Sequence, residues 1–273
     1  MKKNLLVSLK PLQNLLNLDN IGNKINQKNF LPNRFGRVLT QSHCMFRLFV
    51  ALTLITCVCF GQDYVTVPTS YGSVKGVSLE TTNEFLGIPF AQPPVGTLRF
   101  APPLPFVPPS DPNNYIQDAT TYKSACIQAM NSLYTFPGPP SEDCLYLNIY
   151  APKSETPKPV MVWIHGGAYI GGSATQDNYN ASIIAQKGDV IVVTINYRLG
   201  VLGYTAISEF CSQNPHCGFY GILDQQLALQ WVQQNINAFG GNPNNVTIFG
   251  YCQFHFLKHT TIVINITGNP QEQ

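Results

Sequence analysis

The chain has 273 residues, of which 44% are hydrophobic and 11% are charged. This composition can bury the core of one large domain or two small ones, and it excludes a disordered polypeptide. The net charge of +2 hides an acidic body, because residues 1–61 hold eight of the 16 Lys and Arg residues and one acid. That body argues against nucleic acid as a partner.

Two N-terminal segments are expected to lie outside the fold. Residues 1–44 are rich in asparagine and lack an apolar period, so we interpret them as a leader. Residues 45–61 have the pattern of a secretory signal peptide, with Arg47 before a mostly apolar run at 48–60. The sequence therefore predicts a secreted, extracellular protein. An uncleaved signal anchor is the alternative, although a membrane helix needs about 20 apolar residues.

The next part of the chain predicts an antiparallel meander. Residues 64–67, 72–79 and 85–89 have the composition of short strands. Nine prolines within residues 89–112 exclude a regular helix there and indicate an extended path.

Strands and helices then alternate. A strand is predicted at 145–150. Continuous apolar runs, typical of strands buried on both faces, lie at 160–164, 190–195 and 246–250. Helices are predicted between these runs, at 181–186 and 222–239. Such alternation indicates an α/β fold whose parallel strands are joined by right-handed crossovers.

The apolar run at 160–164 leads directly into His165, Gly166 and Gly167. Glycines leave backbone N–H groups uncovered, so that the main chain can approach a ligand closely. Acyl-transfer chemistry needs such donors where the oxygen of a tetrahedral intermediate becomes negative. We therefore expect the N–H groups of Gly166 and Gly167 to form part of an oxyanion hole.

Five of the eight cysteines follow the signal segment. In an oxidising compartment, these five cysteines are expected to form two disulfides and to leave one free thiol. Proximity suggests a Cys211–Cys217 pair, with unpaired thiols as the open alternative. No CxxC or clustered Cys/His spacing is present in the sequence, and we predict neither a metal nor a cofactor.

Five sequence blocks together resemble the type-B carboxylesterase/cholinesterase family of α/β hydrolases. Their order and spacing match the family across residues 64–250. The blocks are FLGIPFAQPPVGTLRF at 85–100, EDCLYLNIY at 142–150, residues 163–172, INYRLG at 195–200 and residues 224–250.

This resemblance implies an α/β-hydrolase fold over residues 62–250. It would be the N-terminal half of a mostly parallel sheet, with an antiparallel meander before it. The resemblance further implies a Cys126–Cys144 disulfide, a structural charge pair between Arg198 and Glu142, and a loop-shaping role for His165. The implied reaction is acyl-enzyme cleavage of a small-molecule ester without metal or cofactor.

The sequence departs from the family where the nucleophile is expected. A Gly-x-Ser-x-Gly elbow should follow the strand at 246–250, but Cys252 occupies the serine position and Phe254 replaces the second glycine. A coincidental cysteine is the favoured interpretation, because thiol activation needs a defined partner. His255 and His259 follow too closely to act as the base, and Glu272 reverses the expected order of acid and histidine.

Residues 251–273 are therefore interpreted as a divergent tail that follows a truncation after residue 250. A strand is expected at 260–265, and the strand at 246–250 is expected to lack a downstream neighbour. Two functions remain open. One is a carboxylic-ester hydrolase by family whose present chain is inactive, and the other is a non-catalytic, neuroligin-like cell-surface adhesion protein. Asn180 is the favoured glycosylation sequon, ahead of Asn245 and Asn265.

Overall fold

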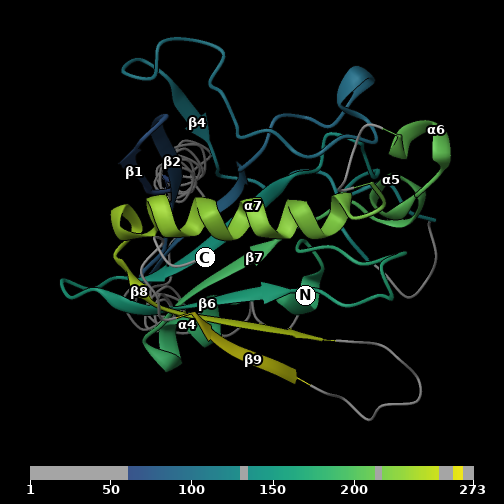
Figure 1. Ribbon diagram of the computed structural model, residues 1–273. Coiled ribbons are helices and arrows are strands. Elements are labelled where there is room, and N and C mark those ends of the chain that lie inside the picture. The colour runs from purple at the N-terminus through teal and green to yellow at the C-terminus, as the bar shows by residue number, and fades with distance from the viewer. Residues whose placement is uncertain (1–60, 130–134, 213–216, 252–260, 267–273) are drawn as a thin grey trace, which may run out of the picture. The chain divides into compact units, whose positions relative to one another are not determined.

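The computed structural model describes residues 61–129, 135–212, 217–251 and 261–266 (Figure 1). The chain divides into two compact units, Met1–Gly61 and Gln62–Gln273, and all described residues except Gly61 belong to the second. The predicted leader and all but the last residue of the predicted signal peptide lie outside the described residues.

A nine-stranded mixed sheet forms the centre of this unit, with the order β1-β2-β3-β5-β7-β6-β8-β9 and with β4 beside β2. The predicted antiparallel meander is confirmed as β1, β2 and β3. The strand bounds are Tyr64–Thr69 (β1), Gly72–Ser78 (β2), Thr82–Pro89 (β3), Ile116–Asp118 (β4), Tyr146–Pro152 (β5), Lys158–Ile164 (β6), Ile191–Ile195 (β7), Gly241–Tyr251 (β8) and Thr261–Ile266 (β9).

Parallel pairing is concentrated in the middle of the sheet. Strand β6 lies between β7 and β8 and is parallel to both, and the short β4 is parallel to β2. The other pairings of the described strands are antiparallel, including β5 with β7. The parallel strands expected from the sequence form the three-stranded centre of the sheet. Helix α4 (Ser182–Gly188) connects β6 to β7, and helix α7 (Tyr220–Asn235) lies between β7 and β8 in the chain.

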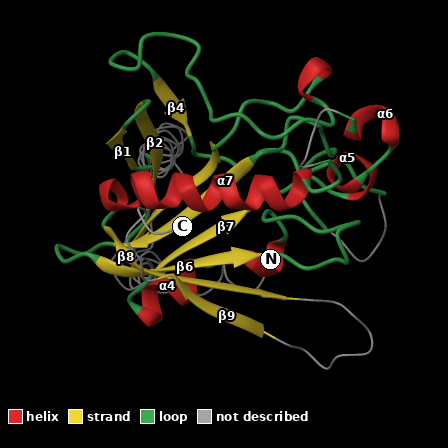
Figure 2. Cartoon of the chain, viewed as in Figure 1, coloured by secondary structure: helices red, strands yellow, loops and turns green. Residues whose placement is uncertain are grey.

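Helices cover both faces of this centre (Figure 2). Neighbouring residues of a strand point to opposite faces, and Val192 and Val193 of β7 belong to different apolar clusters. Val192 packs in the cluster that contains Ala185 of α4, and Val193 in the one that contains Val232 of α7. The helix bounds are Ser182–Gly188 (α4), Gly200–Tyr204 (α5), Ser208–Cys211 (α6) and Tyr220–Asn235 (α7), and the 3₁₀ turns are Gly96–Leu98 (η1), Asp177–Tyr179 (η2) and Ile236–Phe239 (η3).

The end of the long helix follows from its sequence. Helix α7 runs on into η3 and stops at Gly240, which has a φ of 85° that only glycine adopts without strain. Trp231 and Phe239 are buried in the same apolar cluster as residues of the central strands. None of the helices within the described ranges combines the length and the hydropathy of a membrane span.

Residues Thr261–Ile266 of the divergent tail form a strand, whereas a helix follows at this point in the family pattern. Strand β9 pairs antiparallel with β8 from Val246↔Ile266 to Tyr251↔Thr261. The predicted tail strand is therefore confirmed. The expectation that β8 would have no downstream neighbour is wrong, because a short uncharged segment returns along its free edge.

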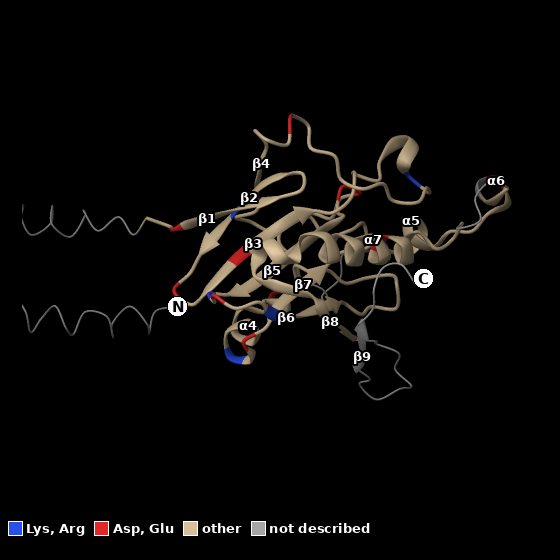
Figure 3. Ribbon diagram, turned by 60° about the vertical axis from the view of Figure 1, so that its left-hand side comes forward, with Lys and Arg blue, Asp and Glu red and all other residues tan. Residues whose placement is uncertain are grey.

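Charged groups are sparse in the described part of the chain (Figure 3), and one ion pair is fully buried. Asp224 on α7 accepts hydrogen bonds from Nε, Nη2 and the backbone N–H of Arg198, at 2.8, 2.7 and 3.0 Å. Both side chains are at most 4% exposed. This pair ties the start of α7 to the chain that leaves β7.

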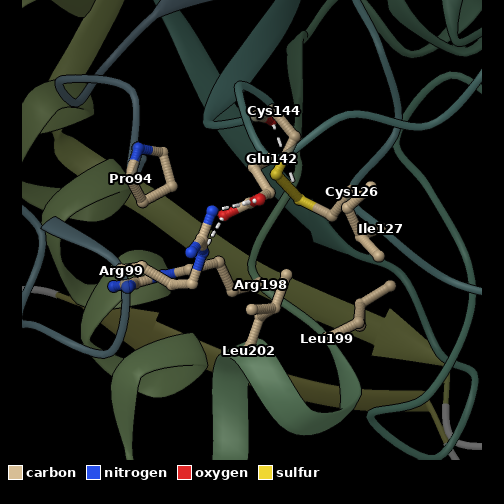
Figure 4. Close-up of a pocket in the computed structure, with 9 residues that line it drawn as sticks. All are labelled: Pro94, Arg99, Cys126, Ile127, Glu142, Cys144, Arg198, Leu199 and Leu202. Carbon is tan, nitrogen blue, oxygen red and sulfur yellow. Dashed lines mark hydrogen bonds and ion pairs between the residues drawn. A yellow bond between two sulfur atoms is a disulfide. The ribbon is translucent and has the colours of Figure 1, made fainter. Parts of the chain in front are cut away.

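The predicted pairing of Arg198 with Glu142 is wrong. Glu142 accepts two hydrogen bonds from Arg99 instead, at 2.6 and 2.7 Å, beside the Cys126–Cys144 disulfide (Figure 4). The reason is burial, because Asp224 satisfies Arg198 inside the protein while Glu142 lies at the surface. The cavity among these groups measures about 10 Å³, roughly the space of one water molecule.

We expect Asp224→Asn to lower the free energy of unfolding by about 3–5 kcal/mol, because it leaves the Arg198 charge buried without its counter-ion. Denaturant unfolding of both proteins measures this loss. The control is Glu142→Gln, which breaks an exposed pair and should cost far less. Equal losses in the two variants would contradict the assigned importance of the buried pair.

Candidate functional site

The candidate site is the glycine turn, residues 165–172, which follows β6. The carboxyl ends of β6, β7 and β8 lie at one edge of the sheet, with Ile164 opposite Ile195 and Gly250. Ligands of α/β sheets bind at this kind of edge. The fold therefore places Gly166 and Gly167 next to the end of β8.

Gly166 lies directly against the last described residue of β8. A Cβ atom at this position would be 2.2 Å from the carbonyl oxygen of Tyr251. Only glycine allows the two backbones to approach so closely. The glycine turn is thus in contact with the residue that precedes Cys252, while Cys252 itself lies outside the described residues.

Three consecutive carbonyl groups of the turn have donors of their own. The His165 carbonyl accepts from the Tyr197 hydroxyl at 2.7 Å, and the Gly166 carbonyl accepts from His165 Nδ1 at 2.9 Å. The Gly167 carbonyl accepts from the N–H groups of Ile170 and Gly171, at 3.0 and 3.1 Å. The C=O and N–H of a trans peptide point in opposite directions. Anchoring the carbonyls therefore directs the following N–H groups, those of Gly166, Gly167 and Ala168, to the other side.

The backbone conformation of the turn suits an anion. Gly167, Ala168 and Tyr169 have φ values of 120°, 53° and 63°, and successive N–H groups in such conformations form anion-binding concavities. No hydrogen bond within the described ranges uses the N–H of Gly167 or Ala168. Ala168 is not among the donors expected from the sequence, because a positive φ at a residue with a Cβ leaves no sign in the sequence.

His165 is buried beneath the turn and is 2% exposed. Its ring stacks on Tyr197, with the ring centroids 4.4 Å apart. Burial lowers the pKa of His165 to about 4, so the imidazole is neutral at pH 7. Since a carbonyl only accepts, the Nδ1 atom must carry the proton that is donated to Gly166. These contacts agree with the loop-shaping role that the sequence suggests.

The other predicted residues fall into three groups. Both disulfides form, with Cα–Cα distances of 4.9 Å for Cys126–Cys144 and 5.1 Å for Cys211–Cys217. Asn180 is exposed and accepts hydrogen bonds from the backbone and hydroxyl of Ser182. The residues outside the described ranges are Cys252, His255, His259 and Glu272.

The described residues do not bring three or more metal-ligating side chains together. What the site offers is a set of backbone donors at the end of a central strand, held by neutral side chains. Such a set stabilises negative charge on an oxygen atom without itself changing protonation state.

The variant Gly166→Ala should lose about 1–3 kcal/mol of stability, because its Cβ cannot enter the contact with the Tyr251 carbonyl without backbone movement. Thermal or denaturant unfolding measures the loss. Gly188→Ala is the matched control, since a Cβ there would make an ordinary contact of 3.4 Å with Val190. A neutral Gly166→Ala variant would show that the two backbones are not in contact.

Acid should destabilise the protein through His165. The pKa of this histidine is about 4 in the folded state and 6.5 when unfolded. Between pH 6.5 and 4 the unfolded chain therefore binds a proton that the folded chain does not, and stability falls as the pH falls. We expect His165→Asn to remove about 3 kcal/mol of this pH dependence. Unfolding measured at pH 7 and pH 4 gives the difference, and parallel pH curves would contradict it.

Comparison with known proteins identifies the family of this fold. The family model for the carboxylesterase family matches residues 63–252. Para-nitrobenzyl esterase of Bacillus subtilis (strain 168) is 46% identical over 188 residues, or 67% of this chain and 37% of that protein. Mouse cholinesterase is 42% identical over 234 residues, or 78% and 36%.

Solved structures agree with this result. A thermophilic PNB esterase superposes with a TM-score of 0.62 at 44% identity, over 69% of this chain and 38% of that structure. The chain thus spans somewhat more than a third of the length of these relatives. Its matching residues include the glycine turn, the strands around it and both members of the Cys126–Cys144 disulfide, and the chain belongs to the carboxylesterase family.

Proposed function

We propose that this chain carries the oxyanion-binding part of a carboxylic-ester hydrolase that acts on small-molecule esters. The observation that supports the proposal most strongly is the anchoring of three successive carbonyls in the glycine turn. It directs the N–H groups of Gly166, Gly167 and Ala168 to the side opposite the bound carbonyls, at the strand edge where α/β enzymes bind ligands. Membership of the carboxylesterase family supports the same reaction.

In the proposed reaction, a nucleophile attacks the ester carbonyl and its oxygen becomes negatively charged. The turn would hold this oxygen through Gly167, together with the flanking Gly166 and Ala168. Each preorganised donor of this kind contributes about 3–4 kcal/mol to the transition state. His165 and Tyr197 would act only by holding the peptide planes, and no metal or organic cofactor takes part.

The 273-residue polypeptide is proposed to be inactive by itself. In its sequence Cys252 stands at the nucleophile position, and Phe254 stands where the elbow needs a second glycine. His255, His259 and Glu272 do not follow in the order and spacing of a catalytic triad. Without base and acid, oxyanion binding alone retains only a small part of the rate acceleration.

The same departures favour one alternative, a non-catalytic binding protein of the neuroligin type at the cell surface. Such a protein needs the scaffold but no serine at position 252. Ester turnover by a form of the protein that carries a complete Gly-x-Ser-x-Gly elbow would separate the two functions, because the adhesion protein has none in any form.

A secreted location fits both functions. Two disulfides support an oxidising compartment, and the exposed Asn180 is available for glycosylation. An uncleaved segment at residues 45–61 would instead attach the protein to a membrane.

The glycine turn should bind a tetrahedral phosphonate, which resembles the intermediate of ester cleavage. We expect an alkylphosphonate to shift the amide NMR signals of Gly167 and Ala168, while the amide of Gly188 on α4 stays unchanged. The physical reason is direct hydrogen bonding from these N–H groups to the anion. Binding confined to other parts of the protein would contradict the proposed oxyanion site.

The proposed inactivity has its own control. The chain should hydrolyse para-nitrophenyl acetate no faster than buffer and should not be labelled by an organophosphate. If it does turn over the ester and Cys252→Ala abolishes the activity, Cys252 is a working nucleophile and the inactivity proposal is wrong. Para-nitrobenzyl esterase serves as the positive control for both reagents.

A further inference from the structure

Gln128 makes an unusual contact with the far end of the glycine turn. Its Oε1 atom accepts a hydrogen bond from the N–H of Gly172 at 2.8 Å, and its Nε2 atom donates to the carbonyl of Gly172 at 2.7 Å. One side-chain amide thus binds both polar groups of a single residue. The Nε2 atom also donates to the carbonyl of Cys126 at 3.1 Å, which ties this contact to the disulfide.

Gly172 in turn touches the residues that direct the N–H of Gly167. Its φ is 110°, and a Cβ atom built there would lie 2.4 Å from His165 Nδ1 and 2.5 Å from the Gly166 carbonyl oxygen. Gly172 is therefore packed against the hydrogen bond between these two groups. Any displacement of Gly172 changes the space available to the His165 ring and to the peptide plane of Gly167.

The segment after Gly172 has a second connection to the same disulfide. Asn196, at the end of β7, donates to the carbonyl of Cys144 at 3.1 Å and accepts from the N–H of Ala174 at 2.8 Å. The carbonyls of both disulfide cysteines are therefore used to hold residues 172–174. Cys126 and Cys144, joined to each other by the disulfide, thus provide two linked attachment points for this part of the chain.

We propose that Gln128 is a positioning residue for the glycine turn, which holds Gly172 and through it the His165–Gly166 contact that directs the oxyanion donors. The chemistry requires glutamine. Glutamate lacks the donor, lysine lacks the acceptor, and only a carboxamide of this length carries both in one plane. This proposal depends on the proposed function in one respect, which is that the glycine turn binds an oxyanion.

Hydrogen exchange of the full 273-residue chain, measured by mass spectrometry on peptides, tests the proposal without requiring catalysis. Gln128→Met keeps the volume of the side chain but makes neither hydrogen bond to Gly172, and Gln128→Glu cannot donate. We expect both variants to speed amide exchange across residues 166–172 about tenfold, with exchange across β7 unchanged. Gln233→Met is the matched control, because Gln233 on α7 donates a similar bond to the carbonyl of Pro243 in β8.

Unchanged exchange at residues 166–172 would overturn the proposal. Acceleration that extends equally to β7 would also overturn it, because Gln128 would then only stabilise the fold in general. If exchange rises in the turn alone while phosphonate does not bind the wild-type chain, the positioning role stands and the proposed function fails. The two failures are therefore separate.

Discussion

The planarity of three peptide bonds is the constraint on which the candidate site depends. A carbonyl that is bound on one side of the glycine turn forces the next N–H to the other side. Tyr197 and His165 bind two of these carbonyls, and the turn itself binds the third. The donors are therefore positioned by two buried side chains and by the backbone of the turn. The free-energy cost of orienting the donors is therefore met when the chain folds and not when a ligand binds.

The rest of the fold holds this turn at the edge of the sheet. The parallel centre, β7-β6-β8, brings the ends of three strands together, and α7 covers it on one face. The buried pair of Arg198 and Asp224 fixes α7 to the segment that leaves β7. Next to it, Asn196 links the disulfide loop to residues that follow the turn. Buried polar groups of this kind are stabilising only when every partner is present.

The sequence predicted most of the regular elements, for reasons that are local. Continuous apolar runs identified β6 and β7, and the helical spacing of Leu227 and Trp231 identified α7, because burial on two faces or one requires those patterns. The three residues of β4 carry no such pattern, and they form a strand because β2 offers them a free edge. The choice of Asp224 over Glu142 as partner of Arg198 likewise depends on which carboxylate the fold buries.

The sequence by itself determined the family, through the motifs that resemble it. It also determined the order of strands and helices along the chain and the glycines that permit close backbone contact, because these follow from local composition and spacing. Only the tertiary structure decided which N–H groups lie opposite a bound carbonyl, that Ala168 is among them, and that Gln128 reaches Gly172 from 44 residues away. Hydrogen bonds between distant segments depend on distance in space and on the direction of each peptide plane, and neither quantity is written in the order of residues.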